Sequence, residues 1–73
     1  MLKRDELTNP KSCLNKAADD EPVFVLRAQD FTAPIVIREW LRINAGTIPF
    51  DKAEEARQLI AAMENWPNRK IPD

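Results

Sequence analysis

The chain has 73 residues, with 11 basic and 12 acidic side chains and a formal net charge of −1. This length allows one compact domain with a thin core, because chains of about this size bury only about 60 % of the surface that they expose when unfolded. The charge balance argues against a dedicated nucleic-acid binder and gives no attraction to anionic membranes. The sequence also contains no apolar run of the length that a membrane span needs.

Few residue types suited to catalysis or metal binding are available. Cys13 is the only cysteine, Gly46 is the only glycine, and histidine is absent. This set cannot supply a structural zinc site, an imidazole base or a glycine-rich phosphate loop. We therefore expect no catalytic residues, no metal and no cofactor, and we interpret Cys13 as a buried, inert thiol. The N-terminus lacks the apolar stretch of a signal peptide, which favours a cytoplasmic location.

The first part of the chain predicts one short helix. Residues 1–10 are polar with mixed charge, and we expect them to form a flexible leader. Ser12 is placed to cap a helix over residues 12–18, because its hydroxyl can accept from the free N–H groups of the first turn. Pro22 follows the end of this helix. Its apolar face comprises Cys13, Leu14, Ala17 and Ala18.

A short apolar run occupies residues 23–26 and reads Val-Phe-Val-Leu. Its length and its β-branched and aromatic residues fit a buried strand. A single strand has no ladder partner. Three arrangements therefore stay open: an extended segment without a sheet, pairing with the leader, or pairing with another chain.

A second helix is predicted from Thr32, which is placed to cap it, to Gly46, which can adopt a left-handed helix end. Pro34 falls in the first turn, where its missing N–H costs nothing. We expect Trp40 to lie in the core, because so small a domain needs its large side chains inside. The predicted inner stripe comprises Ala33, Val36, Ile37, Trp40 and Leu41.

The third helix has the strongest pattern, with Asp51 and Glu54 at capping-box spacing and Trp66 at its end. We expect residues 67–73 to form a flexible tail after a single helical domain at residues 11–66. The fold class is thus mostly α: a small three-helix domain with one short extended or strand segment and flexible tails at both ends. The inner face of the third helix comprises Ala53, Ala56, Leu59, Ile60 and Met63, and its outer face Lys52, Glu55, Gln58 and Glu64.

Several charged and aromatic residues are candidates for contact with a partner. Arg27 and Asp30 follow the apolar run, where they form either an internal ion pair, a helix cap or a polar rim around a binding site. Arg38 and Arg42 share one helix face, which is either solvated or grips an acidic surface. The other candidates are Trp66, as core lid or exposed anchor, and the basic pair Arg69 and Lys70.

The run SCLNKAADDEPVFVLRAQD at residues 12–30 resembles a family of very short bacterial and phage proteins. Residues 33–34, 62–67 and 69–73 resemble it too, so that the resemblance covers most of the chain after residue 10. The chain also resembles, in length and general character, small phage-encoded transcription regulators of the type known from a Xanthomonas phage. That resemblance implies a protein that binds the β and β′ subunits of host RNA polymerase, displaces sigma, inhibits initiation and promotes antitermination.

Three other functions stay open. The first is a phage inhibitor or adaptor that binds another host complex. The second is a weak DNA-binding helix-turn-helix protein. Its recognition helix would be the third helix, where Glu54, Glu55 and Glu64 would repel phosphates. The third is an enzyme or redox protein that acts through Cys13, which has no base beside it in the sequence. We expect a monomer that is not an enzyme and makes no sequence-specific contact with DNA.

Overall fold

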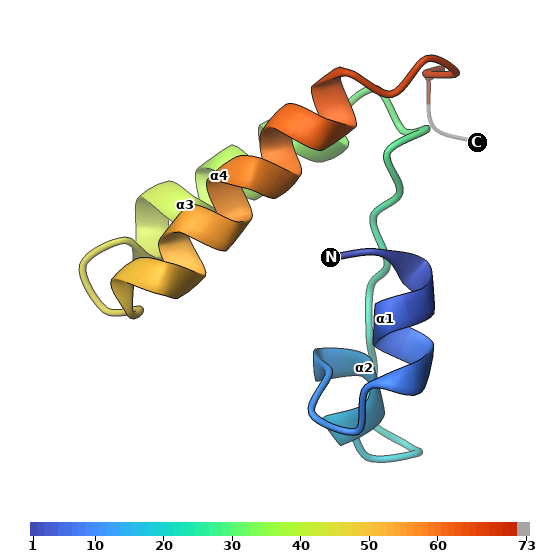
Figure 1. Cartoon of the computed structure of the whole chain (residues 1–73), viewed down its shortest axis with the longest axis vertical. Coiled ribbons are helices and arrows are strands. Elements are labelled where there is room, and N and C mark those ends of the chain that lie inside the picture. The colour runs from blue at the N-terminus through green and yellow to red at the C-terminus, as the bar shows by residue number, and fades with distance from the viewer. Residues whose placement is uncertain (72–73) are drawn as a thin grey trace.

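The computed structural model describes residues 1–71. The predicted mostly helical fold is confirmed, with α1 (Lys3–Thr8), α2 (Cys13–Lys16), α3 (Ala33–Asn44) and α4 (Phe50–Glu64). We call α1 with α2 the N-terminal arm and α3 with α4 the hairpin, because α1 packs against α2 and α3 against α4. Figure 1 shows that the N-terminal arm and the hairpin are separate and are joined by an extended connection.

The leader contains a helix that its sequence did not indicate. α1 spans two turns without an apolar stripe, and none of its residues is buried. The carboxylate of Asp5 accepts a hydrogen bond from the N–H of Leu2 at 3.3 Å. Asp5 and Glu6 also lie in the first turn, where acidic side chains interact favourably with the helix dipole. The start of this helix is therefore stabilised by polar groups, which apolar periodicity does not reveal.

Ser12 caps α2 as predicted, because its hydroxyl accepts from the N–H of Asn15 at 3.1 Å. The helix has a single turn and ends at Lys16, two residues earlier than expected. Cys13 is exposed, so the prediction of a buried thiol was wrong. The reason is that α2 buries none of its own residues, and no apolar core forms beneath it.

The hairpin contains the core of the molecule. Ala53 of α4 is buried in this core, and alanine has the highest helix propensity. The predicted inner face of α4 is confirmed, since Ala56 and Leu59 are half-buried and its other members are buried. The buried residues of the two helices are Ala33 and Pro34 from α3, and Ala53, Ile60 and Met63 from α4.

The predicted inner stripe of α3 is only partly confirmed. Ala33 is buried and Ile37 and Leu41 are half-buried, whereas Val36 and Trp40 are exposed. The expectation that Trp40 lies in the core was therefore wrong. The stripe is wide enough for two neighbouring elements, but α4 covers one flank of it and the N-terminal arm does not pack on the other.

The two ends of α3 differ from the prediction. The side chain of Thr32 caps nothing; instead, the Oδ1 atom of Asp30 accepts from the N–H of Thr32 at 2.9 Å. Gly46 has no positive φ, and the space beside it is open, so the predicted left-handed helix end was wrong. The carbonyl of Asn44 accepts from the N–H groups of Thr47 and Ile48, so the helix ends without a left-handed glycine.

The start of α4 also differs from the prediction. Pro49 precedes its first residue, Phe50, and no side chain caps it, so the expected capping box of Asp51 and Glu54 was wrong. Asp51 cannot be the N-cap residue, because the helix has already begun at Phe50. The helix ends at Glu64, shortly before Trp66.

The connection and the tail form no sheet within residues 1–71. Residues 22–26 are extended, and their backbone groups take part in no hydrogen bond within the part of the chain that the structure describes. The tail contributes one isolated parallel bridge, between Asp30 and Lys70. The predicted flexible tail covered residues 67–73, of which 72 and 73 lie outside the described residues. None of the helices within residues 1–71 has both the length and the apolar character needed to cross a bilayer.

Candidate protein-binding surface

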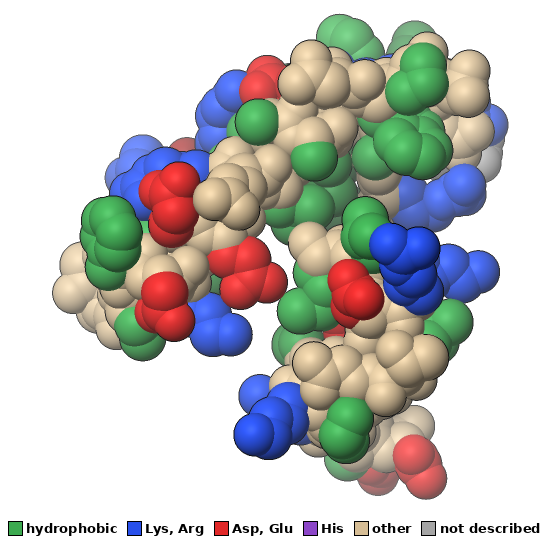
Figure 2. Space-filling view, viewed as in Figure 1, with side chains coloured by type: hydrophobic (Ala, Val, Ile, Leu, Met, Phe, Trp, Pro, Cys, Tyr) green, Lys and Arg blue, Asp and Glu red, His purple; other side chains and the backbone are tan. Residues whose placement is uncertain are grey.

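α3 exposes one complete apolar stripe, made of Val36, Trp40 and Ile43. Their side chains are exposed by 47, 47 and 63 % respectively. The spacing of four and then three residues places all three on one side of the helix, and we call this the outer face of α3. Figure 2 shows hydrophobic side chains at the surface of both the hairpin and the N-terminal arm, with a gap between the two over part of their length. The N-terminal arm does not pack on α3, so the outer face of α3 remains available to a partner.

An ion pair borders the outer face. Arg42 donates to Glu39 through Nε at 3.0 Å and through a second guanidinium nitrogen. Glu39 follows Val36 by three residues and precedes Ile43 by four, so it neighbours both on the helix surface. The hydrogen bond from Arg42 lowers the pKa of the Glu39 carboxyl, and the same bond raises the pKa of Arg42. The pair is a charged, solvated edge beside an apolar centre, an arrangement typical of protein interfaces.

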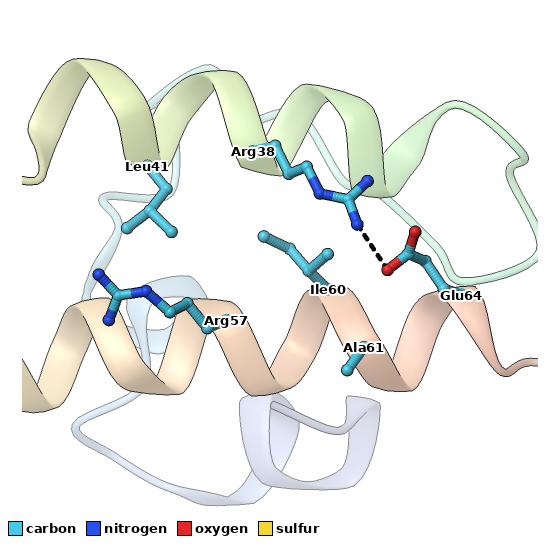
Figure 3. Close-up of a pocket in the computed structure, with 6 residues that line it drawn as sticks. All are labelled: Arg38, Leu41, Arg57, Ile60, Ala61 and Glu64. Carbon is cyan, nitrogen blue, oxygen red and sulfur yellow. Dashed lines mark hydrogen bonds and ion pairs between the residues drawn. The ribbon is translucent and has the colours of Figure 1, made fainter.

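A groove lies between α3 and α4. It has a volume of about 330 Å³ and an open, shallow form. Arg38 spans it from α3 and donates to the carboxylate of Glu64 on α4 at 2.7 Å (Figure 3). Both side chains of this ion pair remain substantially exposed. The groove is lined by Arg38, Leu41, Arg57, Ile60, Ala61 and Glu64.

Arg27 and Asp30 meet through their backbones, because the N–H of Asp30 donates to the carbonyl of Arg27 at 2.9 Å, and they form no ion pair within residues 1–71. The carboxylate of Asp30 accepts from the N–H and the hydroxyl of Thr32 at 2.9 and 2.7 Å, which supports the start of α3. These bonds hold Thr32, the residue that precedes α3, and the free N–H groups of the first turn of α3 have no side-chain cap. Arg27 is exposed, and its guanidinium makes no ion pair within residues 1–71.

The tail folds back on residues 29–31, and we call residues 29–31 with residues 69–70 the clasp. The N–H of Lys70 donates to the carbonyl of Gln29, and the N–H of Phe31 donates to the carbonyl of Lys70, both at 2.7 Å. The guanidinium of Arg69 lies 4.7 Å from the centre of the Phe31 ring and donates to the Phe31 carbonyl at 2.7 Å. Asp30, Arg69 and Lys70 thus come together through the backbone.

The other candidate residues are distributed over the hairpin. Arg38 and Arg42 share the polar side of α3, but each forms an ion pair with a different glutamate. Trp66 is exposed just beyond the end of α4. The exposure of the outer face was missed because periodicity shows which residues share a face but not which element covers that face. The breadth of the α3 stripe was the signal that could have revealed it.

The described residues also bear on metal binding. Within residues 1–71, no three acidic, cysteine or histidine side chains lie close enough together to hold a metal ion.

Comparison with models of protein families, with curated proteins and with solved structures finds no match to this chain. The resemblance to phage transcription regulators therefore stays a prediction, and the functional argument depends on the residues and their arrangement.

Proposed function

We propose that this protein is a phage-encoded transcription regulator that binds the β and β′ subunits of host RNA polymerase in the bacterial cytoplasm. Its outer face of α3 docks on the polymerase. Binding displaces sigma, inhibits initiation and promotes antitermination. The identity of the partner is inferred from the resemblance of the sequence, and the binding surface is inferred from the exposed stripe of α3.

The observation that carries the proposal is the exposure of Trp40 between Val36 and Ile43. An amphipathic helix that lays such a stripe into an apolar groove is a recurrent mode of protein recognition. Tryptophan and arginine are enriched among the residues that dominate binding energy, and Trp40 lies between Glu39 and Arg42 in the sequence of α3. The outer face of α3 thus combines a large apolar side chain, Trp40, with a charged edge formed by Glu39 and Arg42.

The mechanism is a shift between polymerase states. A bound protein favours the states for which it has higher affinity, in proportion to that difference in affinity. A protein of this kind needs no catalytic group, because occupancy of the surface is sufficient. If it binds core polymerase more tightly than polymerase with sigma, sigma binding is weakened by the same factor.

The hairpin geometry does not favour DNA binding. The helices of a helix-turn-helix meet at a steep angle, so that the second can enter the major groove. In Figure 1, α3 and α4 lie side by side along their lengths. α4 also presents Glu55 to solvent, and its charge would repel phosphates.

The test compares two exposed aromatic residues of the hairpin. The immobilised full chain is titrated with purified core polymerase and with holoenzyme, as wild type, Trp40→Ala and the matched control Phe50→Ala. We expect tighter binding of core enzyme than of holoenzyme. Trp40→Ala should weaken binding by more than about tenfold, and Phe50→Ala should leave it unchanged. Absence of core-polymerase binding by the wild type, or equal binding by wild type and Trp40→Ala, contradicts the proposal.

A further inference from the structure

The segment between the N-terminal arm and the hairpin has the properties of an unpaired edge strand. Residues 22–26 are extended and make no backbone hydrogen bond within residues 1–71. Val23 and Val25 are exposed, and Phe24 is the most exposed large apolar side chain of the described chain, at 86 %. β-branched and aromatic residues favour strands, and a row of free N–H and C=O groups is a template for pairing with another chain.

The monomer exposes more surface than its mass predicts. Its accessible surface is 6047 Å² for a mass of 8.4 kDa. A compact folded monomer of this mass exposes about 4600 Å², so the excess is about 1400 Å². A standard-size interface buries about 800 Å² on each partner, so the excess is sufficient for one such interface. A net charge of −1 adds little repulsion between two copies.

The charges at the two ends of this segment are opposite. Glu21, whose carboxylate accepts from the N–H of Ala18 at 3.1 Å, precedes it. Arg27, which has no ion pair within the described residues, follows it. In an antiparallel pair of identical segments centred on Phe24, residue 21 of each copy lies opposite residue 27 of the other. This register also pairs Phe24 with itself and Val23 with Val25. Aromatic and opposite-charge pairs across strands are both stabilising.

We propose that residues 22–26 form the contact between two copies of this chain, paired as antiparallel strands about a twofold axis at Phe24. Val23 and Val25 exchange backbone hydrogen bonds between the copies, and Glu21 of each copy faces Arg27 of the other. Pro22 fits this register, because residues two positions from the self-paired Phe24 have their N–H side away from the partner strand when Val23 and Val25 donate. The protein is then a dimer rather than the monomer expected from its sequence.

This contact is separate from the outer face of α3. It uses none of Val36, Trp40 and Ile43, so dimerisation and polymerase binding can be tested independently. A two-stranded ribbon alone is marginal in water, so association is expected to be weak and to depend on protein concentration.

The test is sedimentation equilibrium of the full chain between about 1 μM and 1 mM. We expect the wild-type mass to rise from 8.4 kDa toward twice that value. Val25→Pro removes a backbone donor that has no acceptor within the monomer, and it should lower the association constant at least about tenfold. The matched control is Asp19→Pro, in the turn between Ala18 and Glu21, where proline is well tolerated. It should dimerise like the wild type.

A charge swap tests the register. Glu21→Arg should weaken the dimer, and the double variant Glu21→Arg/Arg27→Glu should restore it, because opposite charges then face each other again. A wild type of 8.4 kDa at every concentration overturns the proposal, as does dimerisation of Val25→Pro at wild-type strength. A monomer that loses polymerase binding on Val25→Pro assigns the segment to the host protein instead. Trp40→Ala should still dimerise, which distinguishes failure of this contact from failure of the proposed function.

Discussion

The N-terminal arm and the hairpin are held together by different forces. In the arm, the only buried residue is Ser12, whose hydroxyl donates to the carbonyl of Glu6 at 2.7 Å. Glu6 in turn accepts from the N–H of Leu14 at 3.1 Å, and Asn15 donates to the carbonyls of Leu7 and Asn9. The hairpin instead buries apolar side chains between α3 and α4. One region is thus joined by polar contacts over six to eight residues, the other by apolar packing between two longer helices.

This difference has a consequence for binding. α4 covers one flank of α3, and the N-terminal arm does not pack on the other flank. The outer face of α3 is therefore exposed because the arm is held by hydrogen bonds rather than by a core shared with the hairpin. The predictions below test this division, from the largest expected effect to the smallest.

Removal of apolar volume from the hairpin should have the largest effect. Ile60 is buried against α3, and Ile60→Ala should lower the free energy of unfolding by about 2–4 kcal/mol, because it removes buried methyl groups and leaves a cavity. Leu7→Ala, in the arm, is the control, because Leu7 is exposed and its loss should change stability by less than about 0.5 kcal/mol. Denaturant unfolding followed by circular dichroism measures both. Equal losses would contradict the division.

Ser12→Ala should destabilise the arm alone. Ser12 is only 1 % exposed. Its hydroxyl donates to the carbonyl of Glu6 and accepts from the N–H of Asn15. Its removal should cost about 1–2 kcal/mol, because a cap is lost and the Glu6 carbonyl loses its partner. Amide hydrogen exchange should accelerate at Asn15 while the amides of α3 and α4 are unchanged. Acceleration across α4 as well would show that the two regions unfold as one unit.

The Arg38–Glu64 ion pair should contribute little, although it is the one ion pair that joins the two helices of the hairpin within residues 1–71. Both side chains are substantially exposed, so water and salt screen the attraction. A double-mutant cycle with Arg38→Gln and Glu64→Gln should give a coupling energy of about 0.2–1 kcal/mol that falls as salt is added. A salt-independent coupling above that range would mean that the pair, rather than apolar packing, holds the hairpin.

The smallest effect concerns Glu39. Its pKa lies below the ordinary value of 4.5 because Arg42 donates to its charged form. The stabilisation from this pair is therefore present above pH 4.5 and is lost as the pH falls through the lowered pKa of the folded protein. A carboxyl titration by NMR should place the Glu39 midpoint below 4.5, and Arg42→Gln should return it toward that value. An unchanged midpoint in Arg42→Gln would contradict this cause.

Apolar periodicity predicted the hairpin well and the arm poorly. The inner face of α4 was predicted because Ala53, Ile60 and Met63 recur at helical spacing, and the Ser12 cap because its position before a helix is diagnostic. α1 was missed because polar groups stabilise it: Asp5 at its start, and hydrogen bonds to its carbonyls from Ser12 and Asn15 beyond the helix.

The candidate surface was predicted only in part. Arg38 and Arg42 were identified as charges on α3, but the exposure of Trp40 depends on which elements pack together. Such long-range packing has no local signature in the sequence. The clasp was missed for the same reason, because it joins residues 29–31 to residues 69–70 through backbone groups that every residue carries.

The most direct test of the binding surface is hydroxyl-radical footprinting of the full chain with and without core RNA polymerase. This measurement reports the solvent exposure of individual side chains. We expect polymerase to protect Trp40, Val36 and Ile43 and to leave Leu7 of the arm as reactive as in the free chain. Protection of Leu7 with unchanged oxidation of Trp40 would contradict the account, because it would place the binding surface on the N-terminal arm.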